Sequence, residues 1–292
     1  MEQNMKKILI TGANGFVGKK VAEFLANQGF LLTAIVRNKQ WANQNIQFIE
    51  ADLKDIEKLK LDKDFDLVIH LAASLQMYEK NGRLYADNIK ITRKLVDYFK
   101  NTRTYFIYSS SIEVVGPTKA QMIDEKSKSE PTTPYGWVKG DCEEYIRNSG
   151  LNHAILRFGN VSDQNTGLEK EVLKILEQNK LQSWVMKNVL VDYELNIIEV
   201  EKIVQAIYKI IKISPVKQTY FLTDKIISIK DIAVKNGIER KNRKIFLPLV
   251  MFVVSILGVF GRGSLIGYIC SGGMSRKYRR YSNAKILQDL NI

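Results

Sequence analysis

Residues 8–18 read Ile-Leu-Ile-Thr-Gly-Ala-Asn-Gly-Phe-Val-Gly, and this stretch decides the fold. An apolar run of strand length enters a turn with three glycines, and an amphipathic segment with helical spacing follows. Glycine lets the backbone turn tightly and approach a diphosphate closely, while the first amides of a helix attract an anion. The pattern predicts the first strand–turn–helix unit of a dinucleotide-binding Rossmann domain. Such a cofactor would contact Thr11, Gly12, Asn14, Gly15, Phe16, Val17 and Gly18.

Short apolar runs alternate with amphipathic stretches over the first two-thirds of the chain. The predicted strands are Lys7–Ile10, Leu31–Val36, Ile46–Ile49, Leu67–His70, Tyr105–Tyr108, Ala154–Arg157 and Thr219–Leu222. The predicted helices are Phe16–Asn27, Asn88–Lys100, Pro134–Asn148, Glu169–Gln178, Val200–Ile211 and a short one at Ile229–Lys235. This alternation predicts an α/β fold with a doubly wound parallel sheet buried on both faces.

The expected domain organisation follows from this pattern. Residues 1–158 form the predicted Rossmann domain. Residues 159–292 form a small mixed substrate lobe, interleaved with late Rossmann elements, and end in an apolar and basic tail at 240–292.

Composition excludes several classes of protein. The 292 residues are 45% hydrophobic and 26% charged, which suits an enzyme-sized folded domain and excludes a disordered chain. Two cysteines, Cys142 and Cys270, cannot build a disulfide scaffold or a cysteine metal site, and two histidines argue against a zinc hydrolase. We therefore expect no metal. The apolar run after Lys6 and Lys7 is too short for a signal peptide, which favours a cytoplasmic protein.

The net charge of +13 is concentrated in the tail. Residues 240–292 carry ten basic residues and one acid, which leaves about +4 for the rest. Their apolar stretch, 245–260, would span about 24 Å as a helix, short of the ~30 Å hydrocarbon core. Three interpretations stay open: helices of the substrate lobe, peripheral contact of 245–280 with the inner face of a membrane, or a membrane span. The second basic cluster, 276–280, would also suit a sugar-nucleotide diphosphate, and no motif indicates nucleic-acid binding.

The end of the second predicted strand bears on cofactor choice. An acid there would hydrogen-bond the adenosine ribose and repel a 2′-phosphate. This strand ends instead with Arg37, Asn38 and Lys39. A guanidinium pairs well with a phosphate, so the sequence favours NADP(H) over NAD(H).

Tyr135 and Lys139 form the candidate proton-transfer pair. They are four residues apart, so a helix places them on one face, and Thr133 and Pro134 suit the start of that helix. An ammonium beside a phenol favours the phenolate, which predicts a tyrosine pKa lowered toward neutrality. Such a tyrosine exchanges a proton at a carbonyl or alcohol carbon while nicotinamide moves the hydride.

The chain resembles the extended, epimerase/dehydratase-like branch of the short-chain dehydrogenase/reductase superfamily, because several motifs occur in the family's order. Beyond the glycine turn they are Asp52-Leu53, His70-Leu71-Ala72-Ala73, a helix opening at Asn88, Phe106–Ser111, Tyr135-x-x-x-Lys139 and Leu156–Val161. The resemblance implies that Asp52 and Leu53 contact adenine, and that Leu71, Ala72, Ala73 and Asn88 lie along the cofactor. It also implies that Lys139 holds the nicotinamide ribose, that Ser111 orients the substrate oxygen, and that the protein forms a homodimer.

Departures from the family pattern loosen the substrate assignment. Val115 stands where the family often has tyrosine, and Phe158 where it often has proline. Ile112 and Glu113 follow Ser111, which counts against a 4,6-dehydratase.

The tail has Leu247-Pro248 with a long apolar stretch, and Ser282-x-Ala284-Lys285 and Leu287 near its end. It resembles bacterial polysaccharide-pathway reductases and epimerases, which favours a nucleotide-activated or lipid-linked sugar. The expected function is a reductase or epimerase acting at a keto or hydroxyl carbon of such a sugar, in surface polysaccharide synthesis. The alternatives are a reductase or dehydrogenase of a hydrophobic ketone or alcohol, sterol-like or flavonol-like, and a non-catalytic NADP(H)-binding protein.

Overall fold

The computed structural model describes residues 6–73, 83–115, 122–163, 194–228, 231–232, 235 and 280–291. The predicted helix Glu169–Gln178, most of Ile229–Lys235 and the apolar stretch 245–260 lie outside these residues. Within the described part of the chain, no helix combines the length and the apolarity needed to cross a bilayer.

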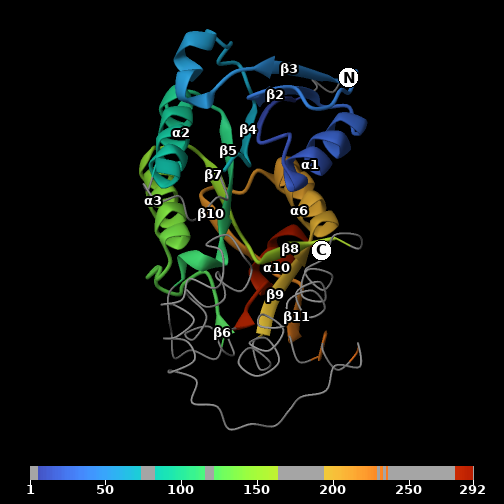
Figure 1. Cartoon of the computed structure of the whole chain (residues 1–292), viewed down its shortest axis with the longest axis vertical. Helices are drawn as coiled ribbons and strands as arrows, with labels where there is room; N and C mark the ends of the chain where they lie inside the picture. The colour runs from blue at the N-terminus through green and yellow to red at the C-terminus, as the bar shows by residue number, and fades with distance from the viewer. Residues whose placement is uncertain are drawn as a thin grey trace, which may run out of the picture.

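The central element is a seven-stranded parallel sheet in the order β10-β7-β5-β4-β1-β2-β3. Its strands are β1 (Lys7–Thr11), β2 (Leu31–Val36), β3 (Ile46–Glu50), β4 (Leu67–His70), β5 (Tyr105–Ser111), β7 (His153–Phe158) and β10 (Gln218–Leu222). The sheet runs through the upper part of Figure 1, and its order reverses beside β1, where ligands of doubly wound sheets bind.

Helices cover both faces of the sheet, as continuous apolar strands require. Helices α1 (Phe16–Asn27) and α6 (Val200–Ile213) pack together on one face, and α2 (Arg83–Phe99) and α3 (Pro134–Asn148) on the other (Figure 1). All residues of β4, β5 and β7 are buried between these layers. A 3₁₀ segment, η1 (Leu53–Leu59), follows β3 and packs on α2.

Smaller elements gather below the carboxyl ends of the strands. Strands β8 (Asn160–Ser162), β9 (Glu194–Glu199) and β11 (Lys225–Ser228) form a mixed three-stranded sheet. Strand β12 (Arg280–Tyr281) pairs with β6 (Met122–Ile123), and α10 (Ala284–Leu290) packs on β10 and α6. The late elements β10 and α10 therefore complete the Rossmann layers.

One predicted boundary is wrong. Helix α2 begins at Arg83, five residues before Asn88, which was expected to open it. Asn88 instead lies inside the helix, where it is 7% exposed and its carbonyl accepts the Thr92 hydroxyl at 2.8 Å. Asparagine prefers helix ends, but burial of Asn88 against its neighbours outweighs that preference here.

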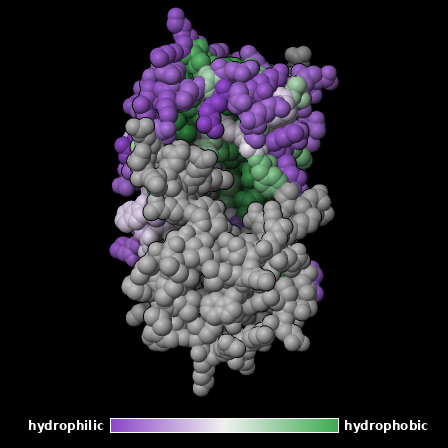
Figure 2. Space-filling view, viewed as in Figure 1, coloured by the Kyte–Doolittle hydropathy of each residue, from purple (hydrophilic) through white to green (hydrophobic). Residues whose placement is uncertain are grey.

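Figure 2 shows how hydrophilic and apolar residues are distributed over one face of the described molecule. Hydrophilic residues cover most of the described upper half, and apolar residues are visible in a hollow near the middle of the view.

Candidate active site

The glycine turn brings two loops into backbone contact. Gly12 has φ +80°, and a Cβ there would lie 2.6 Å from the amide nitrogen of Ala72, in the loop after β4. A Cβ on Gly18 would lie 2.1 Å from the Gly12 carbonyl oxygen. Gly15 donates its amide to the same oxygen at 2.9 Å. Only glycine fits at positions 12 and 18, because backbone occupies the space of any side chain.

The turn leaves groups that suit a diphosphate. Gly15 is the N-cap of α1 and supplies no side-chain cap, so the first amides of the helix keep their capacity to bind an anion. Asn14 donates its Nδ2 to the Asn38 carbonyl at 2.7 Å, while its buried Oδ1 has no partner among the described residues. Phe16 is 43% exposed at the mouth of the turn. These features fit a nicotinamide dinucleotide, with Val17 partly buried behind them.

The end of β2, where the sequence predicts the adenosine, is basic and exposed. Arg37 follows β2 directly and is exposed, as are Asn38 and Lys39. The Lys39 ammonium lies 5.2 Å from the ring centre of Phe48. Across the next connection, Asp52 is exposed and caps η1 by accepting the Lys54 amide at 2.9 Å, whereas Leu53 is 8% exposed and packs in the core.

The loop after β4 lies against the glycine turn. The Leu71 amide donates to the Thr11 carbonyl at 3.2 Å, and the Ala72 amide donates to Thr11 Oγ1 at 3.4 Å. Leu71, Ala72 and Ala73 are all partly buried. The structure thus brings Leu71, Ala72 and Ala73 to the carboxyl edge of β1 and β4, whereas Asn88 lies inside α2.

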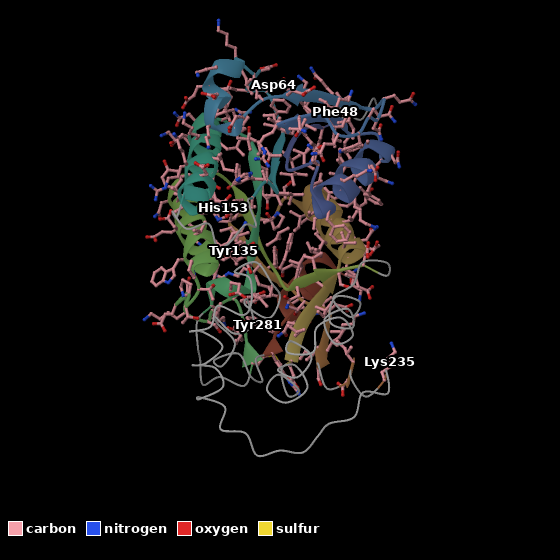
Figure 3. The ribbon with its side chains drawn as sticks, in the orientation of Figure 1. Phe48, Asp64, Tyr135, His153, Lys235 and Tyr281 are labelled. Carbon is pink, nitrogen blue, oxygen red and sulfur yellow. The ribbon has the colours of Figure 1, made fainter. Side chains whose placement is uncertain are left out.

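Helix α3 begins beside the strand that ends in Ser111. Thr133 Oγ1 accepts the Gly136 amide at 3.1 Å as N-cap and donates to Glu113 Oε2 at 2.9 Å. A Cβ on Gly136 would lie 2.4 Å from the Glu113 carbonyl oxygen, so the helix rests on η2 (Ile112–Val114), the short turn after Ser111. Figure 3 shows Tyr135 at the end of α3 nearer to Tyr281.

Tyr135 and Lys139 share the inner face of α3. The Lys139 ammonium is 5.8 Å from the Tyr135 ring centre and 4.7 Å from that of Tyr108, and it donates to the Ser109 carbonyl at 2.5 Å. The side chain of Lys139 is anchored on β5, in keeping with its 3% exposure. The helical spacing predicted from sequence is therefore confirmed, and the roles of the two residues remain predictions.

Burial dominates the acid–base properties of the pair. It raises the pKa of Tyr135 to about 12 and lowers the pKa of Lys139 to about 8, the latter opposed by Cys142 and Glu143. The expectation of a lowered tyrosine pKa is not met in this structure. The reason is that burial removes the hydration that would stabilise the phenolate, and Cys142 adds to the rise in the pKa of Tyr135.

The three consecutive serines differ in their hydrogen bonds. Ser109 Oγ donates to the His70 carbonyl at 3.2 Å, and Ser110 Oγ donates to Glu143 Oε1 at 2.5 Å. Ser111 Oγ accepts the Glu113 amide at 3.2 Å, and within the described part of the chain its proton has no acceptor. Ser111 is thus the serine that retains a hydroxyl proton to donate, which supports its selection from the sequence.

Sequence reasoning missed a buried ion-pair cluster behind the site. Glu143 has no exposed surface and accepts both Nε and Nη2 of Arg157, at 3.0 and 2.8 Å, and Arg147 at 2.7 Å. With Ser110, these contacts join β5, β7 and α3 one turn beyond Lys139. The i,i+4 spacing of Lys139, Glu143 and Arg147 was the available signal, but it indicates an ion pair without revealing burial.

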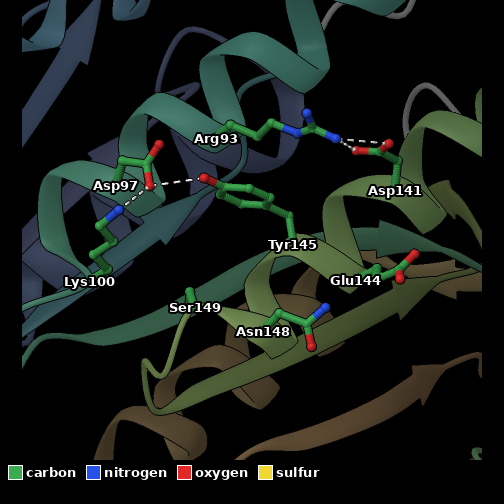
Figure 4. Close-up of a pocket in the computed structure, with 8 residues that line it drawn as sticks. All are labelled: Arg93, Asp97, Lys100, Asp141, Glu144, Tyr145, Asn148 and Ser149. Carbon is green, nitrogen blue, oxygen red and sulfur yellow. Dashed lines mark hydrogen bonds and ion pairs between the residues drawn. The ribbon is translucent and has the colours of Figure 1, made fainter.

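A separate surface pocket of about 440 Å³ lies on the outer faces of α2 and α3 (Figure 4). Its lining residues are Arg93, Asp97, Lys100, Asp141, Glu144, Tyr145, Asn148 and Ser149. Arg93 forms two hydrogen bonds with Asp141, at 2.8 and 3.1 Å, and Tyr145 donates to Asp97 at 2.9 Å. This pocket contains none of the residues singled out from the sequence. Over the described ranges, no cluster of three histidine, cysteine or carboxylate residues suits a metal ion.

The fold, the glycine turn and the Tyr-x-x-x-Lys sequence on α3 define a class: the extended short-chain dehydrogenases/reductases. A family model described as the NAD dependent epimerase/dehydratase family matches residues 8–187, more than half of the chain. The chain belongs to this family. The membership confirms the superfamily and enzyme class expected from the sequence, and supports a nicotinamide dinucleotide cofactor.

Two curated relatives of the chain are named as UDP-glucose 4-epimerases. The chain is 32% identical over 170 residues to UDP-glucose 4-epimerase of Pisum sativum, covering 51% of this chain and 49% of that protein. It is 29% identical over 206 residues to UDP-glucose 4-epimerase of Caenorhabditis elegans, covering 59% of each. The chain thus spans about half the length of the curated relatives it matches.

Solved structures share the fold at greater length. UDP-glucuronic acid 4-epimerase of Bacillus cereus, solved with UDP-glucuronic acid and NAD, has a TM-score of 0.70 at 19% identity and covers 98% of this chain and 93% of its own. UDP-glucose 4-epimerase of Thermotoga maritima, solved with UDP-glucose, has a TM-score of 0.68 at 17% identity and covers 97% and 91%. These likenesses confirm the predicted fold class.

Proposed function

We propose that the protein is a nicotinamide-dependent epimerase or reductase acting at a keto or hydroxyl carbon of a nucleotide-activated sugar. The observation that carries the proposal is the meeting of three parts at the carboxyl edge of one sheet. These are the uncapped glycine turn, Ser111 with its free hydroxyl proton, and the Tyr135–Lys139 pair.

Each residue of the candidate site has a chemical task. The bound cofactor would supply or accept the hydride at the reacting carbon. Tyr135 would exchange the proton of the substrate oxygen, and its high pKa in this structure keeps it a proton donor at neutral pH. Ser111 would donate a hydrogen bond to the same oxygen and orient it. Lys139 would hold the nicotinamide ribose and stabilise the phenolate when the tyrosine gives up its proton.

The substrate class rests on the relatives. The named relatives are UDP-glucose 4-epimerases, and the solved neighbours bind UDP-glucose or UDP-glucuronic acid. We extend this to a UDP-sugar for the present chain, with a role in surface polysaccharide synthesis as the biological setting.

One experiment separates epimerase from reductase. Purified protein is incubated with UDP-glucose, UDP-glucuronic acid and their N-acetylated counterparts, with and without added NADPH or NADH. Formation of the 4-epimer without net cofactor consumption identifies an epimerase, and stoichiometric oxidation of the reduced cofactor identifies a reductase. Failure of all sugars, with turnover of a sterol-like or flavonol-like ketone, would contradict the substrate class.

Tyr135→Phe tests the chemistry. The variant lacks the proton-transferring hydroxyl, so we expect turnover to fall by at least 10²-fold while cofactor affinity stays within a few-fold of wild type. Turnover equal to wild type would refute the mechanism. Loss of turnover and of cofactor binding together would indicate a folding defect, which circular dichroism would reveal.

We further propose that the cofactor is NADP(H), because Arg37 is exposed at the end of β2 and no acid follows that strand. Neighbouring structures contain NAD, so the test must compare both dinucleotides. Arg37→Ala should weaken NADPH binding about tenfold and leave NADH binding unchanged. Tighter binding of NADH by the wild type, unaffected by Arg37→Ala, would overturn the preference.

The tail assignment is tested with lipid. Peripheral contact through 245–280 predicts that the protein binds vesicles containing anionic phosphatidylglycerol and that high salt releases it. Absence of binding would favour placing this segment within the substrate lobe.

A further inference from the structure

His70 is buried between the two loops that meet at the glycine turn. Its side chain has no exposed surface, and both ring nitrogens are hydrogen-bonded. Nδ1 lies 2.7 Å from Thr11 Oγ1 on β1, and Nε2 lies 3.0 Å from Thr92 Oγ1 on α2. One ring therefore joins the strand that enters the glycine turn to a helix on the far face of the sheet.

The surrounding donors define the tautomer of this ring. Thr92 Oγ1 donates its only proton to the Asn88 carbonyl at 2.8 Å, because that carbonyl can only accept. It therefore accepts a proton from His70 Nε2, and its remaining lone pair faces the Cys142 thiol, with which it also forms a hydrogen bond. Nδ1 of the neutral ring is then the acceptor and takes the Thr11 hydroxyl proton. Thr11 Oγ1 keeps a lone pair for the Ala72 amide at 3.4 Å. A consistent chain of donors and acceptors runs from Asn88 to Ala72.

The ring stays neutral within this chain. Burial, together with the Lys139 ammonium, lowers the pKa of His70 to about 3. Physiological pH therefore does not change its charge, and the hydroxyl of Thr92 determines which nitrogen carries the proton.

The same histidine also contacts the strand that anchors the candidate catalytic lysine. Its carbonyl accepts the Ser109 hydroxyl at 3.2 Å, and the Ser109 carbonyl accepts the Lys139 ammonium at 2.5 Å. The His70 ring stacks on the Tyr108 ring with centroids 5.7 Å apart, and the Lys139 ammonium lies over the Tyr108 ring. Displacement of His70 would therefore disturb both halves of the site.

We propose that His70 is a positioning residue whose Nε2–H tautomer, held by Thr92, keeps the glycine turn and the loop after β4 at the spacing that dinucleotide binding requires. The role rests on the proposed function, since it concerns the site of that cofactor. The spacing matters because Gly12 and Ala72 are already in backbone contact. A small shift of either loop therefore changes the space in which the dinucleotide would bind. A merely space-filling histidine would show no dependence on the Thr92 hydroxyl.

A matched pair of variants tests this role. Thr92→Val keeps the shape of the side chain and removes the hydroxyl, and Thr92→Ser keeps the hydroxyl. NADPH and NADH affinities are measured by fluorescence titration of the full chain. We expect Thr92→Val to weaken binding about tenfold, and Thr92→Ser to restore it to within a few-fold of wild type.

The tautomer is measured directly on the same proteins. The chain has two histidines, so ring ¹⁵N shifts of labelled protein are assigned by comparison with His153→Gln. We expect Nε2–H for His70 in the wild type and in Thr92→Ser, and an altered pattern in Thr92→Val. If Thr92→Val does not fold, His70→Gln provides the affinity measurement, because its amide supplies the Nε2 donor without the Nδ1 acceptor.

Three outcomes overturn the proposal. They are Nδ1–H in the wild type, unchanged affinity in a folded Thr92→Val protein, and equal losses in Thr92→Val and Thr92→Ser. In each case a wild type that binds the cofactor and turns over a sugar nucleotide leaves the proposed function standing. A wild type that binds neither NADPH nor NADH instead refutes the proposed function, and the positioning role with it.

Discussion

At the scale of single residues, burial rather than charge sets the properties of the candidate catalytic pair. The sequence identified Tyr135, Lys139 and Ser111 from spacing and order, and the structure places them on adjacent elements. The sequence could not reveal the direction of the tyrosine pKa shift, because that depends on how far folding removes water from the phenol. His70 was visible only as part of a motif, and its two hydroxyl partners lie 59 and 22 residues away.

The lowered pKa of Lys139 predicts a pH-dependent stability. The folded protein releases this proton near pH 8, whereas the unfolded chain holds it to about 10.5. Between these values the unfolded state binds more protons, so the free energy of unfolding contributed by Lys139 rises with pH. Below pH 8 the buried charge carries its full cost.

Urea unfolding of wild type and Lys139→Met at pH 7.5 and 9.5 measures this contribution. We expect the stability of the wild type to rise relative to the variant between the two values. This window precedes the titration of Tyr135, whose raised pKa acts in the opposite direction above pH 10. A difference that is the same at both pH values would show that Lys139 does not titrate in this range.

At the scale of elements, the contacts of α3 determine how the site is assembled. Six strands of the central sheet were predicted to within one residue at each end, because buried parallel strands are continuously apolar. Strand β5 instead runs three residues beyond the predicted Tyr108, to Ser111, because its last residues are buried serines. The start of α2 was not, since Asn88 has the preference of a helix end and is accommodated inside the helix. The contact of α3 with β5 and β7 could not be predicted from the sequence either, because Ser110 and Arg157 are distant in sequence from Glu143.

Two glycines of α3 provide a matched test of its contact with η2. A Cβ at Gly136 would meet the Glu113 carbonyl at 2.4 Å, whereas at Gly140 its nearest neighbours are at 3.8 Å. Gly136→Ala should push the helix away from the turn after Ser111 and lower kcat more than it raises KM. Gly140→Ala should retain activity and gain up to about 1 kcal/mol of stability from helix propensity. Equal kinetics for the two variants would show that the close approach is not needed.

The buried carboxylate of α3 is predicted to stabilise the fold. Glu143→Gln leaves Arg157 buried without a counter-charge, so we expect a loss of about 3–5 kcal/mol in the free energy of unfolding. The neighbouring Glu144 is exposed, and Glu144→Gln serves as the control with an expected change within about 0.5 kcal/mol. Similar urea midpoints for both variants would contradict a stabilising role of the buried ion-pair cluster.

At the scale of the whole molecule, the outer faces of α2 and α3 are the surface to test for self-association. Family resemblance predicts a homodimer, and Trp137 is 63% exposed on the face of α3 that carries Asp141. We expect light scattering to give twice the 33.5 kDa chain mass, and Trp137→Glu to shift the equilibrium to monomer. Ile226→Glu, on β11 and 40% exposed, is the control. A monomeric wild type would contradict the prediction.

The C-terminal elements β12 and α10 return to the Rossmann layers and pack on earlier parts of the chain. Strand β12 closes on β6, its next residue Ser282 donates to the Ile123 carbonyl at 2.7 Å, and α10 then packs on β10. Strand β11 pairs with β9 and strand β12 pairs with β6, so the strands on either side of residues 229–279 are both held by earlier parts of the chain. The C-terminal residues are therefore an integral part of the fold: shortening the chain before β12 would remove the partner of β6 and uncover part of β10.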